Sequence, residues 1–207
     1  MLYRFITIEG NIGAGKTTLA LKLAEHLQAR LILEEFADNP FLPKFYAEPD
    51  QYAFPLELFF MAERYKQLKE MLATRDLFSK YTVSDYLFVK SLLFAKMNLK
   101  ADEFGLYQKL FDIINPQLAQ PDLLIFLNAP VPKLQQNIRK RNRPYEQQIQ
   151  DSYLQNVHNM YMQYIRQHPM RTLMVDTTRM DFLHRPEDFT ALLNALEKDY
   201  PPGISYL

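Results

Sequence analysis

The chain has 207 residues with 24 basic and 24 acidic side chains and no cysteine, which excludes a disulfide scaffold, a thiolate zinc site and a cysteine nucleophile. Its length fits a single domain over residues 1–207 that buries a hydrophobic core. A net charge of zero gives no overall attraction to nucleic acid, and no apolar run approaches the ~18 residues that span a bilayer, so we expect a cytoplasmic protein that binds neither nucleic acid nor membranes.

The predicted elements alternate along the chain between short apolar runs and longer segments with helical periodicity. Five apolar runs are typical of strands buried on both faces of a parallel sheet: Tyr3–Glu9, Arg30–Glu35, Tyr81–Asp85, Asp122–Asn128 and Thr172–Asp176. Helices are predicted over residues 17–28, 51–73, 86–100, 103–118, 131–142, 150–167 and 187–199. This alternation predicts an α/β fold with a five-stranded parallel sheet flanked by helices.

A cluster of glycines follows the first predicted strand. The run Gly10-Asn11-Ile12-Gly13-Ala14-Gly15-Lys16-Thr17 fits the phosphate-binding pattern G-x-x-x-x-G-K-[ST] and leads through Thr18 into a predicted helix. The chain has only 5 glycines, where average usage of roughly 7% predicts about 14. Glycines let backbone N–H groups face a phosphate, Lys16 reaches the β- and γ-phosphates, and Thr17 offers a hydroxyl to Mg²⁺. The pattern predicts binding of a nucleoside triphosphate and leaves the phosphate acceptor open.

Three later segments have a distinctive order and spacing: LEEFADNP after the second predicted strand, SDYLFVKS at the third, and IRKRNRPYEQ after the fourth. Together with GNIGAGKTT they resemble the deoxynucleoside kinase family over nearly the whole chain. These P-loop enzymes transfer the γ-phosphate of ATP to the 5′-hydroxyl of a deoxynucleoside. The resemblance implies a P-loop kinase fold with a short basic lid, ATP and Mg²⁺ as cofactors, a small-molecule deoxynucleoside substrate and a homodimer.

Glu35 stands where the family has the glutamate that accepts the proton of the 5′-hydroxyl. Phe36 replaces the proline that usually comes next in the family. A carboxylate at the end of a strand is suited to orient a hydroxyl during phosphoryl transfer. The adjacent Glu34 is expected to point to the opposite face of the strand. The alternative for Glu35 is a surface charge or a residue near the cap of the next helix.

Tyr46, Glu57 and Arg64 reproduce the spacing of three substrate-binding residues of the family: a tyrosine, a glutamine eleven residues later and an arginine seven residues beyond. By resemblance they contact the sugar 3′-hydroxyl, the base and the 5′ end of the nucleoside. Glu57 and Arg64 are two helical turns apart, so they share one face of a helix. The alternatives are a half-buried aromatic ring for Tyr46 and a solvated ion pair with Glu63 or Glu57 for Arg64.

Glu57 departs from the family, which has glutamine at this place. Glutamine both donates and accepts hydrogen bonds, whereas an ionised glutamate only accepts them. A carboxylate suits a base edge with N–H donors, such as N1–H and N2–H₂ of guanine. It suits adenine and cytosine poorly, because their ring nitrogens on that edge are acceptors. We therefore expect a preference for guanine or thymine; the alternative is that Glu57 pairs with a nearby cation and does not contact the base.

Asp85, at the end of the third predicted strand, matches the acidic residue that serves Mg²⁺ in the family. Tyr86 stands where the family has an arginine that contacts the catalytic carboxylate and the phosphate. Lys90 is one helical turn further on, so it is our candidate for the missing cation; the alternative is a solvated lysine. Phe94 resembles the aromatic residue that stacks on the base, although core packing would suit it equally. Ser91 falls where the family has an aspartate that reads the base.

The basic segment 137–147 resembles the R-G-R-x-x-E lid of the family. Arg141 and Arg143 match two arginines that clamp phosphate, and Glu146 matches a glutamate that contacts the sugar. Asn142 replaces the glycine and tolerates the left-handed conformation, while Asn137 stands where the family has an earlier arginine. Such a lid offsets negative charge during transfer and helps to exclude water. The alternative is a basic helix end favoured by the helix dipole.

After the last predicted strand, Asp181 and Phe182 fall in a loop that by resemblance lies against the adenine of ATP.

The leading hypothesis is a deoxynucleoside kinase in which Lys16, Arg141 and Arg143 offset the phosphate charge. Catalysis would come from positioning and electrostatics.

Two alternatives remain open. A nucleoside monophosphate kinase of the thymidylate kinase type shares the phosphate-binding loop, but the Asp-Arg-Tyr-like signature of that family is not matched by Asp85 and Tyr86. A weakly catalytic, nucleotide-binding regulatory subunit is supported only by Tyr86 in place of arginine.

Overall fold

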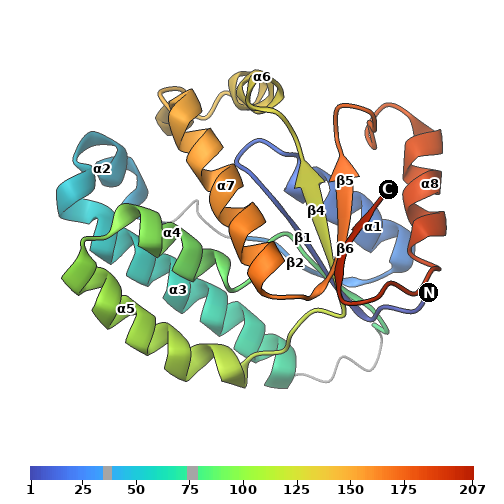
Figure 1. The fold of residues 1–207 in the computed structure, drawn as a ribbon, viewed down its shortest axis with the longest axis horizontal. Coiled ribbons are helices and arrows are strands. Elements are labelled where there is room, and N and C mark those ends of the chain that lie inside the picture. Colours follow the sequence, from blue (N-terminus) through green and yellow to red (C-terminus); the bar gives the residue numbers. More distant parts are fainter. Residues whose placement is uncertain (35–38, 74–78) are drawn as a thin grey trace. The chain divides into compact units, whose positions relative to one another are not determined.

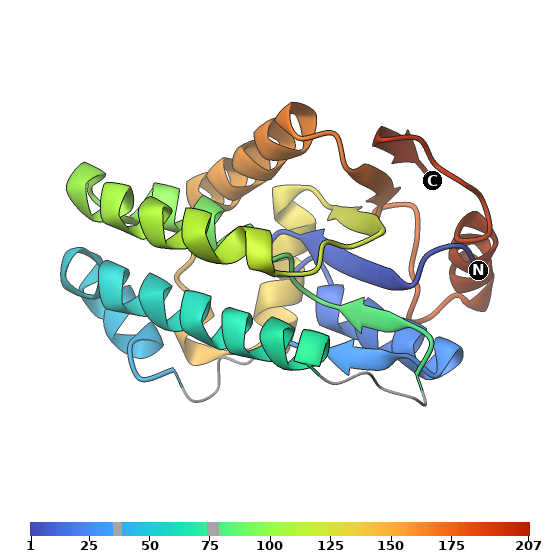
Figure 2. The same ribbon diagram turned by 90° about the horizontal axis from the view of Figure 1, so that it is seen from below.

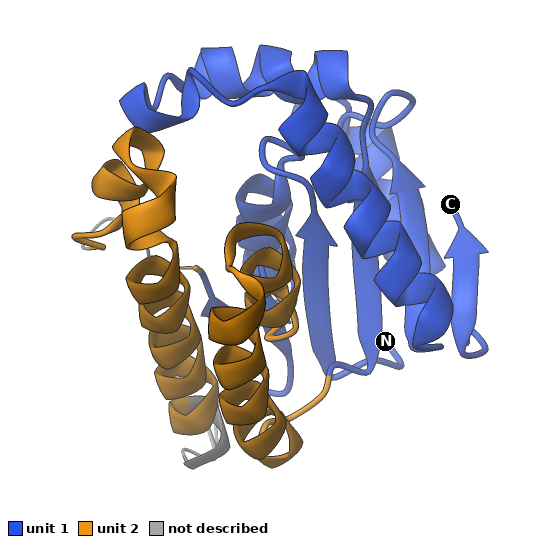
Figure 3. Ribbon diagram, turned by 60° about the vertical axis from the view of Figure 1, so that its left-hand side comes forward, with its two compact units in different colours: residues 1–33, 78–86, 121–207 blue, residues 34–77, 87–120 orange. Residues whose placement is uncertain are grey.

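The computed structural model of the chain describes residues 1–34, 39–73 and 79–207, and the chain falls into two compact units. Unit 1 comprises residues 1–33, 78–86 and 121–207, and unit 2 comprises residues 34–77 and 87–120 (Figure 3). The single domain expected over residues 1–207 stays a prediction. Within the described ranges, no helix is long and apolar enough to cross a membrane.

Unit 1 contains a parallel sheet in the order β2-β3-β1-β4-β5-β6 (Figure 1). Its described strands are β1 (Phe5–Gly10), β2 (Arg30–Ile32), β3 (Thr82–Ser84), β4 (Leu123–Asn128), β5 (Arg171–Asp176) and β6 (Gly203–Tyr206). The apolar runs of the sequence form the first five, and side chains such as Ile8 and Ile125 are completely buried. The α/β fold with a mainly apolar, helix-covered sheet is therefore confirmed.

The prediction of five strands was wrong, because β6 adds a sixth to the described sheet. β6 pairs in parallel with β5, with Arg171 opposite Gly203 and Met174 opposite Tyr206. It lies at the edge of the sheet, and none of its four residues is fully buried. A short, partly exposed edge strand lacks the continuous apolar run that identified the other strands.

Helices pack on both faces of this sheet. α1 (Lys16–Leu27) lies on one face and α7 (Asp151–Gln167) on the other, and Figures 1 and 2 agree on this placement. α1 buries Leu19 and Leu23, which belong to the apolar stripe that predicted it. The other helical segments of unit 1 are α6 (Val131–Arg141), η2 (Pro144–Glu146) and α8 (Pro186–Ala195).

The described part of unit 2 is helical. Its elements are α2 (Leu42–Ala47), α3 (Pro49–Ala73), α4 (Lys90–Asn98), α5 (Ala101–Ile114) and the short η1 (Asn115–Gln117). α3 and α5 lie side by side in both ribbon views (Figures 1 and 2). α4 begins later than the predicted residue 86, because a buried turn precedes it in which the Lys90 N–H bonds the Leu87 carbonyl at 2.9 Å. No helix was predicted at α2, because its six residues bury no apolar stripe.

Candidate active site

The phosphate-binding loop joins β1 to α1 and needs glycine at two places. Gly10 and Gly13 adopt φ values of 151° and 80°, which side-chain-bearing residues rarely adopt. A Cβ at Gly10 would lie 2.7 Å from the Leu127 carbonyl oxygen, and one at Gly13 would lie 2.8 Å from the Leu134 carbonyl oxygen. Both contacts are with backbone, which cannot move aside like a flexible side chain. The glycine cluster therefore shapes the loop, as the sequence indicated.

Two asparagine side chains hold the loop in place. The Asn11 amide donates to the Leu154 carbonyl at 2.7 Å, and the Asn137 amide donates to the Gly13 carbonyl at 2.7 Å. The Lys16 ammonium lies over the loop and donates to the carbonyls of Gly10 and Asn11, at 3.0 Å in each case. In the sequence analysis Asn137 was noted only because it stands where the family has an arginine. In the structure it is an anchor of the phosphate-binding loop.

Glu9 also holds the phosphate-binding loop, and the sequence analysis did not predict this role. Its side chain is completely buried at the end of β1, directly before the loop. The Tyr161 hydroxyl donates to Glu9 Oε2 at 3.0 Å, and the Gly10 N–H donates to the same oxygen at 3.1 Å. A buried carboxylate needs such donors. The only signal in the sequence is an acidic residue inside an otherwise apolar strand.

Thr17 and Asp85 come together at the carboxyl ends of β1 and β3. These strands pair in parallel with Thr7 opposite Ser84, so the loop after β1 and the residue after β3 emerge at one edge of the sheet. The Thr17 hydroxyl donates to Oδ2 of the buried Asp85 at 2.6 Å. The described residues contain no cluster of three or more His, Cys, Asp or Glu side chains able to hold a metal ion. One hydroxyl and one carboxylate fit Mg²⁺, which keeps several waters and takes other ligands from phosphates.

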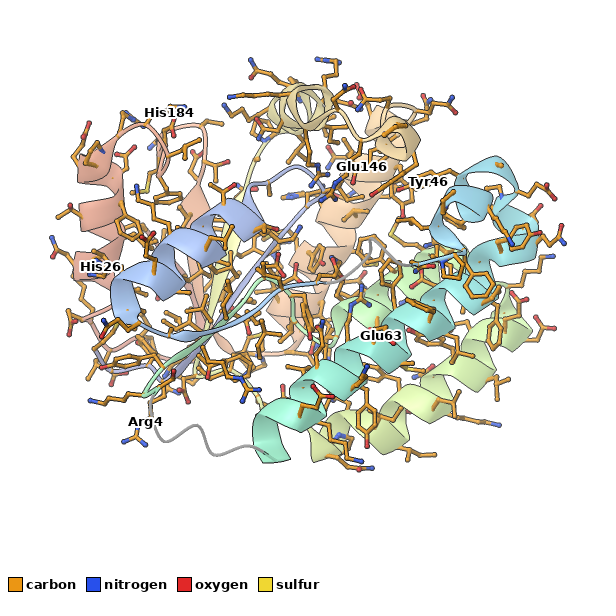
Figure 4. The ribbon with its side chains drawn as sticks, turned by 180° about the vertical axis from the view of Figure 1, so that it is seen from behind. Arg4, His26, Tyr46, Glu63, Glu146 and His184 are labelled. Carbon is orange, nitrogen blue, oxygen red and sulfur yellow. The ribbon has the colours of Figure 1, made fainter. Side chains whose placement is uncertain are left out.

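The basic lid segment forms its own cluster at the end of α6. Asn142 has φ 56°, so it adopts the left-handed conformation that asparagine tolerates better than most residues. Arg141 and Arg143 both bond the Glu146 carboxylate, with Arg143 Nη1 at 3.3 Å from Oε1. Glu146 is buried in η2, where Figure 4 labels it. The structure therefore brings the three predicted lid residues together, and their contacts with phosphate and sugar stay predictions.

The loop after β5 is held by hydrogen bonds of its own. Asp181 Oδ1 accepts the N–H groups of Leu183 and His184 at 3.0 Å each, and the bond from His184 is the main reason that the pKa of Asp181 falls to about 2. Phe182 is buried, and its carbonyl accepts a hydrogen bond from Lys22 Nζ at 2.5 Å. The adenine contacts expected of Asp181 and Phe182 stay predictions.

Glu34, Arg64 and Lys90 form a buried ion cluster in unit 2. Arg64 Nε lies 2.9 Å and Nη2 lies 2.5 Å from Glu34 Oε1, and Lys90 Nζ lies 2.5 Å from Glu34 Oε2. The three side chains are only 4 to 10% exposed. Burial by itself raises the pKa of Glu34, but the charges of Lys90 and Arg64 outweigh it and hold that pKa well below its usual range. Glu34 is therefore a permanently ionised carboxylate between two cations.

This cluster tests the alternatives that the sequence left open for Lys90 and Arg64. Lys90 is buried and bound to a carboxylate, so the alternative of a solvated lysine is wrong, and Arg64 pairs with Glu34 instead of Glu63 or Glu57. Glu35, like Phe36, lies outside the described residues. We did not predict Glu34 as a site residue, because the expected strand extended to residue 35 and its alternation of faces would turn Glu34 away from Glu35. In the structure β2 ends at Ile32, so this alternation does not reach Glu34.

Glu57 lies on α3 with an incomplete set of hydrogen bonds. Its side chain is 2% exposed, its Oε1 accepts the Asn98 amide at 2.7 Å, and its Oε2 is buried with no hydrogen-bond partner among the described residues. Burial is the main cause that raises the pKa of Glu57 to about 7. In the described part of the chain its side-chain partner is a neutral amide and not a cation. A buried oxygen without a donor is unusual and calls for a functional explanation.

The remaining residues expected at the substrate occupy unit 2 as well. Ser91 Oγ accepts Arg64 Nη1 at 2.7 Å, so it holds the arginine. Lys90 Nζ lies 5.6 Å from the centre of the Phe94 ring, a cation–π distance. Tyr46 is half-buried on α2 beside Phe45, with the ring centres 5.5 Å apart (Figure 4). Stacking of Phe94 on a base and the contact of Tyr46 with a sugar stay predictions.

Tyr86 does not supply the missing cation. It is 1% exposed, and its backbone carbonyl accepts the Ser84 hydroxyl at 2.5 Å. The phenol ring therefore packs in the interior, and the replacement of the family's arginine by Lys90 stays a prediction.

Comparisons with known proteins agree on one family. A family model described as deoxynucleoside kinase matches residues 6–200. The deoxyguanosine kinase of Bacillus subtilis (strain 168) is 37% identical over 193 residues, covering 89% of this chain and 92% of that protein. The deoxyadenosine kinase of Dictyostelium discoideum is 33% identical over 166 residues, covering 78% and 66%. A solved deoxyadenosine kinase from M. mycoides, with products dCMP and a flexible dCDP bound, shares the fold at TM-score 0.81 and 21% identity, covering 93% of this chain and 98% of that one.

Proposed function

The chain belongs to the deoxynucleoside kinase family and phosphorylates a deoxynucleoside with ATP, and we propose that deoxyguanosine is its preferred substrate. The observation that carries this preference is the buried Glu57 carboxyl, one oxygen of which meets no hydrogen-bond donor from residues 1–34, 39–73 and 79–207. Guanine presents two adjacent donors, N1–H and N2–H₂, which a carboxylate can accept together. Thymine presents one N–H on the corresponding edge and would leave an oxygen unmatched. The similarity to a deoxyguanosine kinase of Bacillus subtilis supports the same base.

The phosphate side of the reaction would be served by unit 1. The N–H groups of the loop Gly10–Thr17, followed by Thr18, would surround the phosphates at the N-terminus of α1. Lys16, Arg141 and Arg143 would offset the charge of the group in transfer. Thr17 and Asp85 would hold Mg²⁺, which when bound neutralises phosphate charge.

A carboxylate after β2 would orient the 5′-hydroxyl and take its proton. The family resemblance favours Glu35, and the geometry favours Glu34, which two cations keep ionised. A carboxylate with a low pKa is sufficient for this task, because phosphoryl transfer passes through a loose transition state in which positioning contributes most. We therefore assign Glu34 as the first candidate for the base and Glu35 as the second.

The enzyme would work in the cytoplasm as a homodimer, without nucleic acid or membrane partners. Exposed apolar side chains support the dimer, since Leu106 is 53% and Ile113 is 65% exposed on α5. The alternatives of a thymidylate-kinase-type enzyme and of a regulatory subunit are not favoured, because the family match extends over residues 6–200.

A panel of the four deoxynucleosides with ATP and Mg²⁺ tests the proposed substrate. We expect kcat/KM for deoxyguanosine to exceed that for deoxyadenosine by about tenfold to a hundredfold, the range of one or two hydrogen bonds that an active site makes or leaves unpaired. dGMP serves as the control acceptor and should not be phosphorylated. Equal turnover of deoxyadenosine and deoxyguanosine would exclude the proposed preference, and turnover of dGMP instead would indicate a monophosphate kinase.

The Thr17→Val variant tests the proposed metal site. Valine has the shape of threonine but offers no hydroxyl, so the Mg²⁺ concentration for half-maximal activity should rise about tenfold, as for loss of one group around a metal. The matched control is Thr190→Val, an exposed threonine on α8 whose hydroxyl bonds only the Pro186 carbonyl in the described structure. An unchanged Mg²⁺ requirement in Thr17→Val would remove Thr17 from the site.

A further inference from the structure

The Glu57 carboxyl has two chemically different oxygens. Oε1 already accepts the Asn98 amide at 2.7 Å, whereas Oε2 is buried and has no partner in the part of the chain that the structure describes. If the group carries a proton, Asn98 keeps Oε1 as the acceptor, so the proton belongs on Oε2. The oxygen that lacks a partner is therefore the one whose role, acceptor or donor, depends on the charge of the group.

Charged and titratable groups from three helices, α3, α4 and α5, act on Glu57. Arg64 lies on its own helix α3, Lys90 on α4 with Asn98, and Tyr107 on α5, and Glu34 adds a negative charge. Burial raises the pKa of Glu57 to about 7, against the lowering effects of Asn98, Arg64 and Lys90. The two cations act at a distance, because both are bound to Glu34. Near neutral pH the group therefore exists in both forms.

We propose that the charge of Glu57 selects the base: the ionised carboxylate accepts N1–H and N2–H₂ of guanine, and the neutral acid pairs with adenine. In the neutral form Oε2–H donates to adenine N1 while Oε1 accepts the adenine N6–H. This is the donor and acceptor pattern of a glutamine side chain. The proton is exchanged with solvent, and no other reactant is needed. We call this role of the Glu57 charge the selector. It rests on the proposed function, since it acts on the base of the same substrate.

The expected effect follows from the population of the two forms. With a pKa of about 7, roughly nine tenths of the groups are ionised at pH 8 and one tenth at pH 6. A ligand that needs one form binds with an apparent affinity reduced by the population of that form. Affinity for deoxyguanosine should therefore fall about tenfold from pH 8 to pH 6, and affinity for deoxyadenosine should rise about tenfold. The ratio of the two changes about a hundredfold.

Calorimetric binding of each deoxynucleoside to the full chain at pH 6, 7 and 8 tests the selector without turnover. We expect the hundredfold change of ratio in the unaltered protein, with proton release on deoxyguanosine binding and proton uptake on deoxyadenosine binding near pH 7, measured in buffers of different ionisation enthalpy. Glu57→Gln should prefer deoxyadenosine at every pH with a constant ratio. Glu63→Gln, which changes a neighbouring carboxyl on the same helix (Figure 4), should behave like the unaltered protein.

A second variant keeps the test decisive if Glu57→Gln does not fold. Asn98→Ala removes a hydrogen bond that lowers the pKa of Glu57, so the midpoint of the change in base preference should move to higher pH. A deoxyguanosine preference that is constant between pH 6 and 8 in the unaltered protein would overturn the selector and leave the proposed function intact. If deoxyadenosine binds more tightly at every pH and the ratio of the two affinities does not change, both the selector and the proposed base are wrong.

Discussion

Replacing Glu34 with Gln should lower kcat for deoxynucleoside phosphorylation about a thousandfold, within the range known for loss of a catalytic acid or base. Glutamine keeps the size of the side chain but cannot accept the hydroxyl proton. It also leaves Arg64 and Lys90 without their shared negative partner. The KM for ATP should change little, because the phosphate-binding loop belongs to other residues. Steady-state kinetics with both substrates varied give these constants.

The matched control for this prediction is Glu35→Gln, one residue further along the chain. If Glu34 is the base, Glu35→Gln should retain kcat within a few-fold. The reverse result would assign the base to Glu35 and make Glu34 a positioning residue for Arg64 and Lys90. Because breaking a buried ion pair costs about 3–5 kcal/mol, thermal melting of Glu34→Gln must accompany the kinetics, and activity must be measured well below its melting temperature.

Lys90→Met is expected to lower kcat about a hundredfold, comparable to removal of one preorganised electrostatic contact. Methionine preserves the apolar stem of lysine and removes only the charge. Arg64 would still bind Glu34 through Nε and Nη2, so the carboxylate stays ionised and the fold is expected to persist. The loss would therefore report the positive charge of Lys90, the first residue of α4, which we propose replaces the arginine that the family has at the position of Tyr86.

Two further variants make this prediction specific. Lys96→Met removes an exposed lysine from the same helix and should leave kcat unchanged. Lys90→Arg keeps the cation and should recover a large part of the activity. If Lys90→Met turns over like the unaltered protein, Lys90 is a structural partner of Glu34 and the reaction does not use its charge.

The phosphate-binding loop and the lid turn could be predicted because their signals are local. Gly10 and Gly13 carry φ values that call for glycine, and Asn142 is one of the few residue types that tolerates the left-handed conformation found there. Each of these requirements depends on the residue itself and its neighbours in the sequence. The α/β class was predictable for a related reason, since strands buried on both faces must be apolar throughout.

The ion cluster of Glu34, Arg64 and Lys90 and the hydrogen bond between Asn98 and Glu57 could not be predicted in the same way. Glu34 lies 30 residues from Arg64 and 56 from Lys90, and Glu57 lies 41 residues from Asn98. Nothing in a single sequence indicates which of several carboxylates a distant cation will reach. The choice between Glu34 and Glu35 also depended on where a three-residue strand ends, and strand ends are set by the pairing of neighbouring strands.

The bond from Asn137 to the Gly13 carbonyl has a consequence for how such enzymes can be altered. Asn137 and Arg141 are one turn apart on α6, and Gly13 also lies against the Leu134 carbonyl of that helix. The loop and the helix that ends in the basic residues therefore form one interlocked block. A chimera that exchanges the glycine loop without α6, or α6 without the loop, would put at risk both the bond from Asn137 to Gly13 and the close approach of Gly13 to Leu134. The glycine loop and α6 should therefore be exchanged together in such a chimera.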